Sequence, residues 1–461
     1  MMRSMYSAIA GLKAHQTKMD VIGNNIANVN TVGFKSSSVV FSDVYYQTLQ
    51  SATGANPATG TAGQNAKQIG LGSKLTAITT NMTTQGGAQA TDNAMDLMLS
   101  GDGFFIVNNG GVNCFTKAGA FNIDAAGNLA TSNGSLVMGW ATDERGEIIK
   151  SQVKKLDIMS PDNLYAEPEA TKKAFLSGNI DSTDVQLTGE GVPFTVNFYD
   201  NLGFNYTAVF SVTPVEGKIA EYTVTLSDIL DQDSKSITKI TNPDGTVTET
   251  GTKGDIGTST SLVFDASSGQ FKSVGGVTDE KAENYGLVNL KITGTGDAAK
   301  SFPVDGINID FSSLTQYSTN GTSSITSTRG KKGTGEDAGM PVGNMKGVSI
   351  ESSGRIYGTY DNGTKKLLGQ IAVATFANPS GLEAVGDRMF SETQNSGEFD
   401  GIGKEVTEGG GSMVSGYLEM SNVDLSNEFT NMITTQRGFQ ANSRIITTSD
   451  SFLEELVNLK R

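Results

Sequence analysis

The strongest constraint on how this chain folds lies in its two ends, where hydrophobic residues recur at every seventh position. Near the N-terminus one series is Met5, Leu12, Met19 and Ile26, and a second is Ala8, His15, Ile22 and Val29. Near the C-terminus the series is Leu425, Met432, Phe439, Ile446 and Leu453. A sevenfold repeat keeps one stripe of a helix against a partner helix. Neither end has a second such segment beside it in the sequence, so we expect the ends to meet each other or other subunits.

The long middle of the chain is typical of turn-rich β structure. Gly accounts for 56 of the 461 residues, whereas charged residues make up only 18%. Residues 104–107 form a candidate buried strand, a hairpin signal follows at 108–111, and Phe194, Val196 and Phe198 alternate with polar residues. We therefore predict a mainly β protein with α-helical termini. The terminal helices would form a coiled-coil-like domain, with nested β-rich inner and outer domains between them.

The order of these patterns predicts domains that are built from both ends of the chain. Residues 51–68 are almost all small or polar and cannot bury a core, so we interpret them as part of a linker. Asp424 is a candidate N-cap for the C-terminal helix. The predicted limits are 1–30 and 422–461 for the terminal helical domain, 31–68 for an extended linker, 69–155 and 335–421 for the inner β domain, and 156–334 for the outer β domain in one or two parts.

The composition excludes several kinds of function. The chain has one Cys, Cys114, and one His, His15, whereas zinc sites and iron–sulfur clusters need several such ligands. A catalytic histidine would have to be His15, which we interpret instead as a residue of the helical seam. We predict no catalytic residue, no cofactor and no metal. The net charge of −15 argues against nucleic acid and anionic membranes as partners.

The sequence also bears on location. No stretch approaches the roughly 20 apolar residues that a transmembrane helix needs. Lys13, His15 and Lys18 interrupt the apolar region that a secretory signal would require near the N-terminus. We therefore expect a protein that is either cytoplasmic or exported without a cleaved signal, and no insertion into a membrane.

Several segments resemble one known family, the bacterial flagellar rod and hook proteins. Residues 24–35 (NNIANVNTVGFK) are similar to the N-terminal signature of that family, and residues 421–425 (SNVDL) with 435–444 (TQRGFQANSR) are similar to its C-terminal signature. Residues 68–72, 101–107 and 369–382 resemble its inner β domain, and 199–203 resembles its outer domain. The motif positions are Asn24, Asn25, Asn28, Asn30, Gly33, Phe34, Gln436, Arg437 and Asn442. Cys114 stands where the family leads us to expect an aromatic residue.

The resemblance implies a hook subunit, because rod proteins are shorter and lack most of the middle insertion. It implies export through the flagellar export apparatus to the cell surface, and self-association into a curved, flexible tube that transmits torque from rod to filament. The implied partners are further copies of the chain and the rod, hook-cap and hook–filament junction proteins. Two alternatives stay open: a distal rod subunit and, in a different class, a secreted β-rich adhesin or glycan-active enzyme.

The residues that we expect at subunit contacts are those of the helical repeats. They are Met5, Leu12, Met19, Ile22, Ile26, Val29, Leu425, Met432, Phe439, Ile446 and Leu453. Gly438 has two interpretations. It is either a tolerated weak point, which costs about 1 kcal/mol of helix stability relative to Ala, or a place where a neighbouring helix approaches closely.

Overall fold

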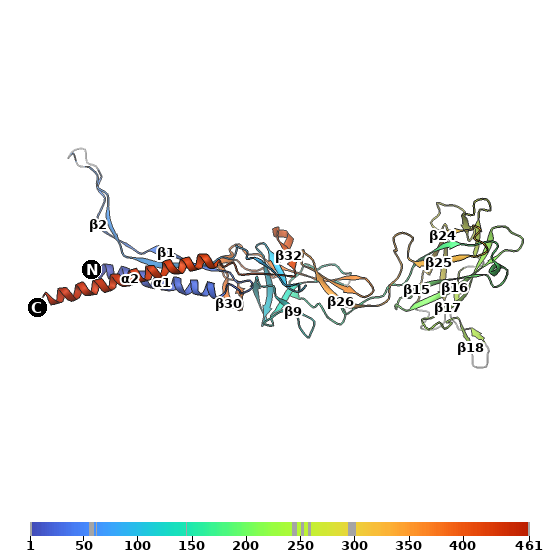
Figure 1. Ribbon diagram of the computed structural model, residues 1–461, viewed down its shortest axis with the longest axis horizontal. Coiled ribbons are helices and arrows are strands. Elements are labelled where there is room, and N and C mark those ends of the chain that lie inside the picture. The colour runs from blue at the N-terminus through green and yellow to red at the C-terminus, as the bar shows by residue number, and fades with distance from the viewer. Residues whose placement is uncertain are drawn as a thin grey trace. The chain divides into compact units, whose positions relative to one another are not determined.

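The computed structural model describes residues 2–54, 60, 62–143, 145–241, 247–249, 253–256, 260–293 and 301–459. The chain forms two compact units. The first unit contains Met1–Asn163, Gly347–Gly358 and Lys365–Arg461, and the second contains Leu164–Lys346 and Thr359–Thr364. The secondary structure is mainly β, with one long helix near each end of the chain (Figure 1), which confirms the predicted fold class.

The two long helices belong to the first unit. They are α1 (Met2–Ala27) and α2 (Leu425–Asn458), as the sevenfold repeats predict. Asp424 is the N-cap of α2, because its carboxylate accepts hydrogen bonds from the backbone N–H groups of Ser426 at 2.8 Å and Asn427 at 3.3 Å. Short 3₁₀ turns occur farther along the chain, at η1 (Val185–Thr188), η3 (Pro379–Gly381) and η4 (Val406–Gly409).

The segment that we expected to be an extended linker is instead part of a β ribbon. Strand β1 (Ser37–Asp43) pairs antiparallel with β4 (Ser73–Thr80), and β2 (Tyr46–Gln50) pairs with β3 (Lys67–Gly70). The linker prediction was wrong for residues 37–50 and 67–68, where strands without a core of their own satisfy their backbone hydrogen bonds by pairing with each other. Some of their side chains, such as Val40 and Leu49, are apolar and exposed.

The β structure of the first unit centres on one sheet. Its strand order within this unit is β28-β11-β7-β8-β31-β30, with β10, β12 and β29 attached beside this path and β9 paired with β10. The strands are β7 (Phe104–Asn109), β8 (Val112–Thr116), β9 (Phe121–Ile123), β10 (Leu129–Thr131), β11 (Leu136–Ala141), β12 (Lys154–Lys155), β28 (Lys365–Ile371), β29 (Val373–Ala374), β30 (Glu383–Gly386) and β31 (Met389–Ser391). Two further pairs join β5 (Ala88–Ala90) to β33 (Tyr417–Glu419) and β6 (Leu97–Ser100) to β32 (Ser412–Ser415). The predicted strand at 104–107 and the hairpin after it are confirmed by the β7–β8 pairing.

The core of this sheet is aromatic. Phe115 packs edge-to-face on Phe376 with the ring centroids 4.7 Å apart, and Phe104 lies against the same ring at 5.9 Å. The single Trp, Trp140, is buried and donates from Nε1 to the carbonyl of Ile402 at 2.9 Å. Cys114 is buried in β8, where burial raises the pKa of its thiol.

The second unit is a β sandwich. One sheet has the order β15-β16-β17-β21-β22 and the other has the order β20-β23-β24-β14-β25. The strands of the unit are β13 (Tyr165–Ala166), β14 (Lys173–Asn179), β15 (Val192–Tyr199), β16 (Asn205–Pro214), β17 (Glu221–Leu230), β18 (Lys239–Thr241), β19 (Val247–Glu249), β20 (Lys253–Asp255), β21 (Thr260–Phe264), β22 (Phe271–Val274), β23 (Leu287–Thr293), β24 (Ile307–Thr315) and β25 (Ser324–Arg329). Strands β26 (Gly343–Ile350) and β27 (Arg355–Tyr360) contain residues of both units.

The two sheets of the second unit share one hydrophobic core. Phe194 of β15 stacks on Phe210 of β16 at 5.0 Å, and it meets Phe311 of the other sheet edge-to-face at 6.2 Å. Leu156 and Ile158, which we had assigned to the outer domain, are buried in the first unit instead. The backbone N–H of Ile158 donates to the carbonyl of Gly127, so the chain leaves the first unit only after these residues.

Candidate assembly surface

The terminal helices α1 and α2 pack against each other along the first unit (Figure 1). The amide Nδ2 of Asn25 donates to Oε1 of Glu428 at 3.3 Å. Farther along, a Cβ atom at Gly438 would lie 2.8 Å from the ring of His15, and one at Gly11 would lie 2.7 Å from Nδ2 of Asn442. Numbers fall along α1 as they rise along α2, so the helices are antiparallel. The close-approach interpretation of Gly438 therefore applies, with α1 as the neighbouring helix.

The seam between the helices is built from small and polar residues as much as from large apolar ones. On α1, Ala8, Gly11, Ala14 and Ile22 are buried. On α2, the buried residues are Thr435 and Ser449. Thr435, Asn442 and Ser449 form a second sevenfold series on α2, three residues after Met432, Phe439 and Ile446. Hydrophobic spacing could not reveal this series, because its members are polar.

The predicted contact residues lie beside this seam rather than away from it. Ile22 is buried, and the half-buried members are Met5, Leu12, Met19, Ile26, Val29, Met432, Phe439, Ile446 and Leu453. Leu425, in the first turn of α2, is 39% exposed. Val29 follows the end of α1. Most of these side chains thus contribute to packing within one chain, and their part in contacts between copies stays a prediction.

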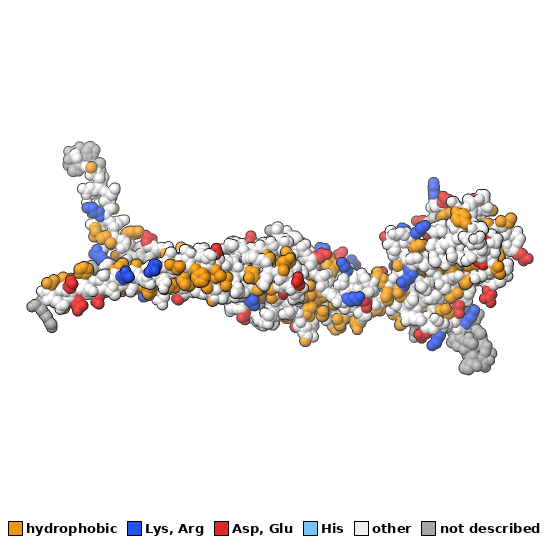
Figure 2. All heavy atoms as spheres, in the orientation of Figure 1, with side chains coloured by type: hydrophobic (Ala, Val, Ile, Leu, Met, Phe, Trp, Pro, Cys, Tyr) orange, Lys and Arg blue, Asp and Glu red, His pale blue; other side chains and the backbone are white. Residues whose placement is uncertain are grey.

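A different set of large apolar side chains on the two helices is exposed in the single chain. We name it the outward apolar surface, and its members are Tyr6, Ile9, Phe429, Ile433, Ile445, Phe452 and Leu456. These side chains are between 37% and 65% exposed. Figure 2 shows orange hydrophobic side chains along the helices. Large apolar side chains that are exposed in this number are typical of an interaction site.

The N-terminal motif residues form the junction at which α1 meets the β ribbon. Asn25 is 1% exposed, and its amide bonds Ser37 twice: Nδ2 donates to the carbonyl at 2.8 Å, and Oδ1 accepts from the N–H at 3.0 Å. Asn28 donates to the carbonyl of Asn24 at 2.9 Å and accepts from the Thr31 hydroxyl at 3.1 Å, which turns the chain out of the helix. Asn30 is exposed in this turn, and Phe34 is half-buried after it.

Gly33 is required a few residues later in the same junction. Its φ is +69°, a left-handed conformation that favours glycine, and a Cβ atom there would lie 2.8 Å from the backbone nitrogen of Ala118. Its N–H donates to the carbonyl of Glu419 at 2.7 Å. The N-terminal motif is thereby tied to the segment that leads into α2.

A buried ion pair closes this junction, and the sequence patterns did not reveal it. Nζ of Lys35 lies 2.8 Å from Oε1 of Glu419, and the two side chains are 2% and 0% exposed. Glu419 Oε1 also accepts from the N–H of Gly86 at 2.9 Å, and Lys35 also donates to the carbonyl of Thr84 at 2.8 Å. The residues lie at opposite ends of the chain, so spacing along the sequence carries no signal for the pair.

A second lysine lies in the same buried region. Lys117 donates to the carbonyl of Gly101 at 2.6 Å, and its Nζ lies 5.1 Å from the ring centre of Phe104. Burial lowers the pKa of Lys117 to about 8, although the carboxylate of Glu419 raises it in part. Glu419 is therefore the shared counter-charge of two buried cations.

The C-terminal motif residues divide between the two sides of α2. Asn442 faces Gly11 in the seam. Gln436 and Arg437 are exposed, and Arg437 makes a hydrogen bond of 3.3 Å to Gln440 of its own helix. Gln436 and Arg437 thus point away from the folded chain.

His15 makes the helix pair sensitive to pH. Its Nδ1 is buried without a hydrogen-bond partner among the described residues. Burial first, and the nearby positive charge of Lys18 second, lower the pKa of His15 below its ordinary value. The unfolded chain therefore binds a proton more readily than the folded chain. Stability from this group is full above about pH 6.5 and is lost as the pH falls below that value.

We expect the melting temperature of α1 and α2, followed by circular dichroism at 222 nm, to be lower at pH 5.5 than at pH 7.5. The His15→Gln variant should lose most of this difference, because glutamine does not titrate. An equal pH dependence in the variant would show that carboxylates, rather than His15, cause the effect.

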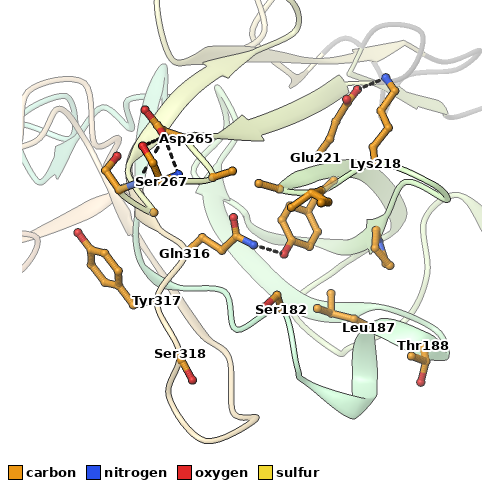
Figure 3. A pocket seen from close by; sticks show the side chains of 17 residues that line it. Ser182, Leu187, Thr188, Lys218, Glu221, Asp265, Ser267, Gln316, Tyr317 and Ser318 are labelled. Carbon is orange, nitrogen blue, oxygen red and sulfur yellow. Dashed lines mark hydrogen bonds and ion pairs between the residues drawn. The ribbon is translucent and has the colours of Figure 1, made fainter.

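The second unit contains a pocket of about 520 Å³, shown in Figure 3. Its polar side chains bond to one another: Gln316 donates to the Tyr222 hydroxyl at 2.8 Å, and Lys218 pairs with Glu221 at 2.8 Å. Asp265 accepts from the N–H of Ser267 at 2.8 Å. The two carboxylates of the pocket are thus engaged in local structure. This arrangement gives no support to a glycan-active enzyme, in which two carboxylates flank the scissile bond.

Within the described ranges, His, Cys, Asp and Glu side chains form no group of three or more that could hold a metal ion. No helix in the described part of the chain has the length and hydrophobicity to cross a membrane.

Three family signatures match the chain. Residues 5–35 match the family described as "Flagella basal body rod protein", and residues 98–175 match "Flagellar hook protein FlgE/F/G D1 domain". Residues 414–459 match "Flagellar basal body rod FlgEFG protein C-terminal". The first and last of these segments contain most of α1 and all of α2 with the junction residues.

Similar proteins match over their whole length. The "Flagellar hook protein FlgE" of Borreliella burgdorferi is 36% identical, and the protein of the same name from Treponema pallidum is 35% identical; each match covers 100% of both chains. The "Flagellar basal-body rod protein FlgG" of Bacillus subtilis is 28% identical, again over 100% of both chains.

Proposed function

The chain belongs to the flagellar hook protein family, and we propose from this premise that its paired terminal helices are the surface through which copies assemble. As a member of this family, the chain is a structural subunit of the flagellar hook. The family is structural and is not known for catalysis.

The outward apolar surface is the observation that carries the proposal. Phe452 is 58% exposed and Ile433 is 58% exposed, although both lie on a helix whose other side is packed. Covering an apolar side chain of this size stabilises an assembly by roughly 1.5–3 kcal/mol if it is fully exposed at the start, and by about half of that here. Seven such side chains contribute roughly 5–10 kcal/mol, which is of the same order as the association cost of about 4–15 kcal/mol.

The geometry of a tube follows from unlike surfaces. When one surface of a subunit binds a different surface of the next, and the rotation does not close a ring, the result is an open helical assembly. The outward apolar surface would bind helices of neighbouring copies and line the tube. Gln436 and Arg437, which point away from the folded chain, would add polar contacts there.

Location and partners are proposed from family membership. The chain would leave the cell through the flagellar export apparatus and polymerise at the cell surface into a curved, flexible tube that transmits torque. The rod, hook-cap and hook–filament junction proteins would meet the ends of this tube.

A distal rod subunit is the second candidate, since one relative named as a rod protein matches over 100% of both chains. The expectation that rod proteins are shorter does not hold for this relative, so length does not separate the two candidates. The relatives named as hook proteins are 36% and 35% identical, against 28% for the rod protein, and this difference favours the hook.

Polymerisation of the purified full-length chain tests the proposal. We expect electron microscopy to show hollow tubes that are curved, as a hook requires. Straight tubes would favour the rod, and a chain that stays monomeric at high concentration and high salt would contradict assembly through its own surfaces.

Removal of most of the second unit should leave assembly intact. Glu169 and Met340 exchange backbone hydrogen bonds of 3.0 and 2.8 Å, so the chain enters and leaves the sandwich at adjacent positions. Deleting residues 171–338 joins Ala170 to Gly339 as a two-residue turn. We expect this variant to form tubes whose curvature or stiffness differs from that of the full chain. Failure to form any tube would show that the second unit is needed for the wall itself.

A further inference from the structure

One sheet of the second unit presents hydroxyl and amide side chains on its outer side. Strand β15 alternates buried apolar residues with exposed polar ones. Strands β16 and β17 also alternate, although most of their outward residues are half-buried and one of these, Val209, is apolar. We name this surface the front face, and its residues are Thr195, Asn197, Thr207, Ser211, Thr223, Thr225 and Ser227.

The side chains of the front face bond to one another across the strands. Ser211 and Thr225 lie 2.8 Å apart, and Thr207 donates to Asn197 at 2.8 Å. A hydroxyl has one donor and two acceptor positions, so each of these groups keeps the capacity for a further bond. The front face can therefore bind a second polar surface without losing its own hydrogen bonds.

The front face is nearly free of charge. Strands β15, β16 and β17 contain two charged residues, Glu221 and Asp228. Glu221 pairs with Lys218 at 2.8 Å, and Asp228 accepts from the hydroxyl of Ser236 at 2.6 Å and from that of Thr238. For comparison, charged residues make up 18% of the whole chain.

The other sheet has a similar surface, which we name the back face. Its residues are Ser177, Asn179, Ser313, Thr315, Thr326 and Thr328, with the half-buried ring of Phe175 among them. Ser177 lies opposite Thr326 in the β14–β25 register, and their hydroxyls are 3.1 Å apart. Thr315 donates to Asn179 at 3.1 Å.

Charged side chains border the back face, and Lys332 reaches onto it, since its Nζ donates to the Ser313 hydroxyl at 2.6 Å. Lys173 pairs with Asp337 at 2.6 Å, and the Arg329 guanidinium lies 4.3 Å from the ring centre of Tyr199. Asp310 accepts from the N–H of Ser312 at 2.8 Å. Because the inner sides of both sheets share one core, the front and back faces point in opposite directions.

We propose that the front face of one copy packs against the back face of the next copy in the assembly. The proposal rests on the proposed function, because it needs a helical polymer. Each copy carries a net charge of −15, so contacts between copies are strongly disfavoured where acidic residues meet. The two faces are surfaces on which copies can approach without that repulsion. They are unlike surfaces on opposite sides of one unit, which is what an open helical assembly requires.

Paired charge substitutions in the full-length chain test this contact. Thr225 and Thr326 are both exposed, so a charge at either position leaves the core untouched. In the variant Thr225→Glu with Thr326→Glu, like charges would meet between copies. In the variant Thr225→Glu with Thr326→Lys, opposite charges would meet. The control, Gln232→Glu with Ala266→Glu, adds the same charge as the first variant on exposed loops.

The measurement is the critical concentration for polymerisation at about 10 mM salt, where charges act over roughly 30 Å. We expect the Glu/Glu variant to raise it about tenfold or more, and the Glu/Lys variant to stay within about threefold of wild type. In 0.5 M salt the defect of the Glu/Glu variant should shrink. Circular dichroism of the monomers should match wild type.

Two results separate this proposal from the proposed function. Equal critical concentrations for the Glu/Glu, Glu/Lys and control variants, with tubes formed by all, would overturn the contact between faces and leave the hook function intact. Absence of tubes from the wild-type chain itself would overturn the proposed function. A defect of the same size in the control would also overturn the contact, because net charge alone would explain it.

Discussion

Replacing Glu419 with Gln is expected to destabilise the first unit by about 3–5 kcal/mol, the typical effect of removing one partner from a buried ion pair. Lys35, 2% exposed, would remain buried without a counter-charge, and Lys117 would lose the anion that supports its protonated form. Urea denaturation of the full-length chain, followed by the fluorescence of Trp140, measures this loss. Trp140 is the single Trp and lies in the first unit, so the signal reports on that unit alone.

Two variants control for the Glu419 result. Lys35→Met combined with Glu419→Leu removes both charges and should recover much of the lost stability. Glu405→Gln breaks a partly exposed ion pair, in which the Lys150 side chain is 51% exposed and the Glu405 side chain is 21% exposed. This variant should cost less than about 1 kcal/mol of stability. If Glu419→Gln were no more harmful than Glu405→Gln, the ion pair would not be what holds the junction together.

Phe452→Asp is expected to block tube formation while leaving the monomer folded. The side chain is 58% exposed in the single chain, so folding loses little when it is replaced. In the assembly the new carboxylate would be buried without a partner, at a cost of several kcal/mol. The critical concentration should rise about a hundredfold or more. Light scattering measures polymerisation, and circular dichroism checks the fold.

Ser451→Asp is the matched control for Phe452→Asp. Ser451 is the preceding residue and is exposed, so this variant adds the same charge beside the outward apolar surface without removing an apolar side chain. It should polymerise nearly as wild type does. An equal defect in both variants would point to charge repulsion, and normal tubes from Phe452→Asp would remove the outward apolar surface from the interface.

The elements of the fold were largely predictable, because they follow from local patterns. The sevenfold repeats predicted both helices, the apolar run at 104–107 predicted β7, and alternation predicted β15. The β ribbon formed by β1 to β4 was missed, since its strands have no core of their own and flank a polar segment that resembles a linker in composition. The end of the first unit was placed too early, because burial of Leu156 depends on residues far away in the sequence.

The candidate site was less predictable. The apolar repeats identify α1 and α2 as packed helices, but the repeat residues themselves lie beside the α1–α2 seam in the single chain. The outward apolar surface has irregular spacing, so only the packed structure separates Phe452 from Phe439. The seam residues Thr435 and Ser449 and the Lys35–Glu419 pair were missed for the same reason: each becomes special only through a partner hundreds of residues away.

The long separation along the sequence between these partners determines the order in which the parts of the molecule fold. Lys35 and Glu419 lie 384 residues apart and Asn25 and Glu428 lie 403 apart, whereas most of the second unit comes from one continuous stretch, Leu164–Lys346. Contacts between distant residues form slowly, because closing a long loop costs entropy before any contact repays it. If the N-terminus emerges first, α1 and Lys35 cannot make these contacts until the C-terminal residues have also emerged. The second unit can complete its sandwich earlier. The second unit lies between the two helices in the sequence, and once it has folded it brings the two ends of the chain nearer. The junction that joins the termini is therefore the last part of the molecule to form.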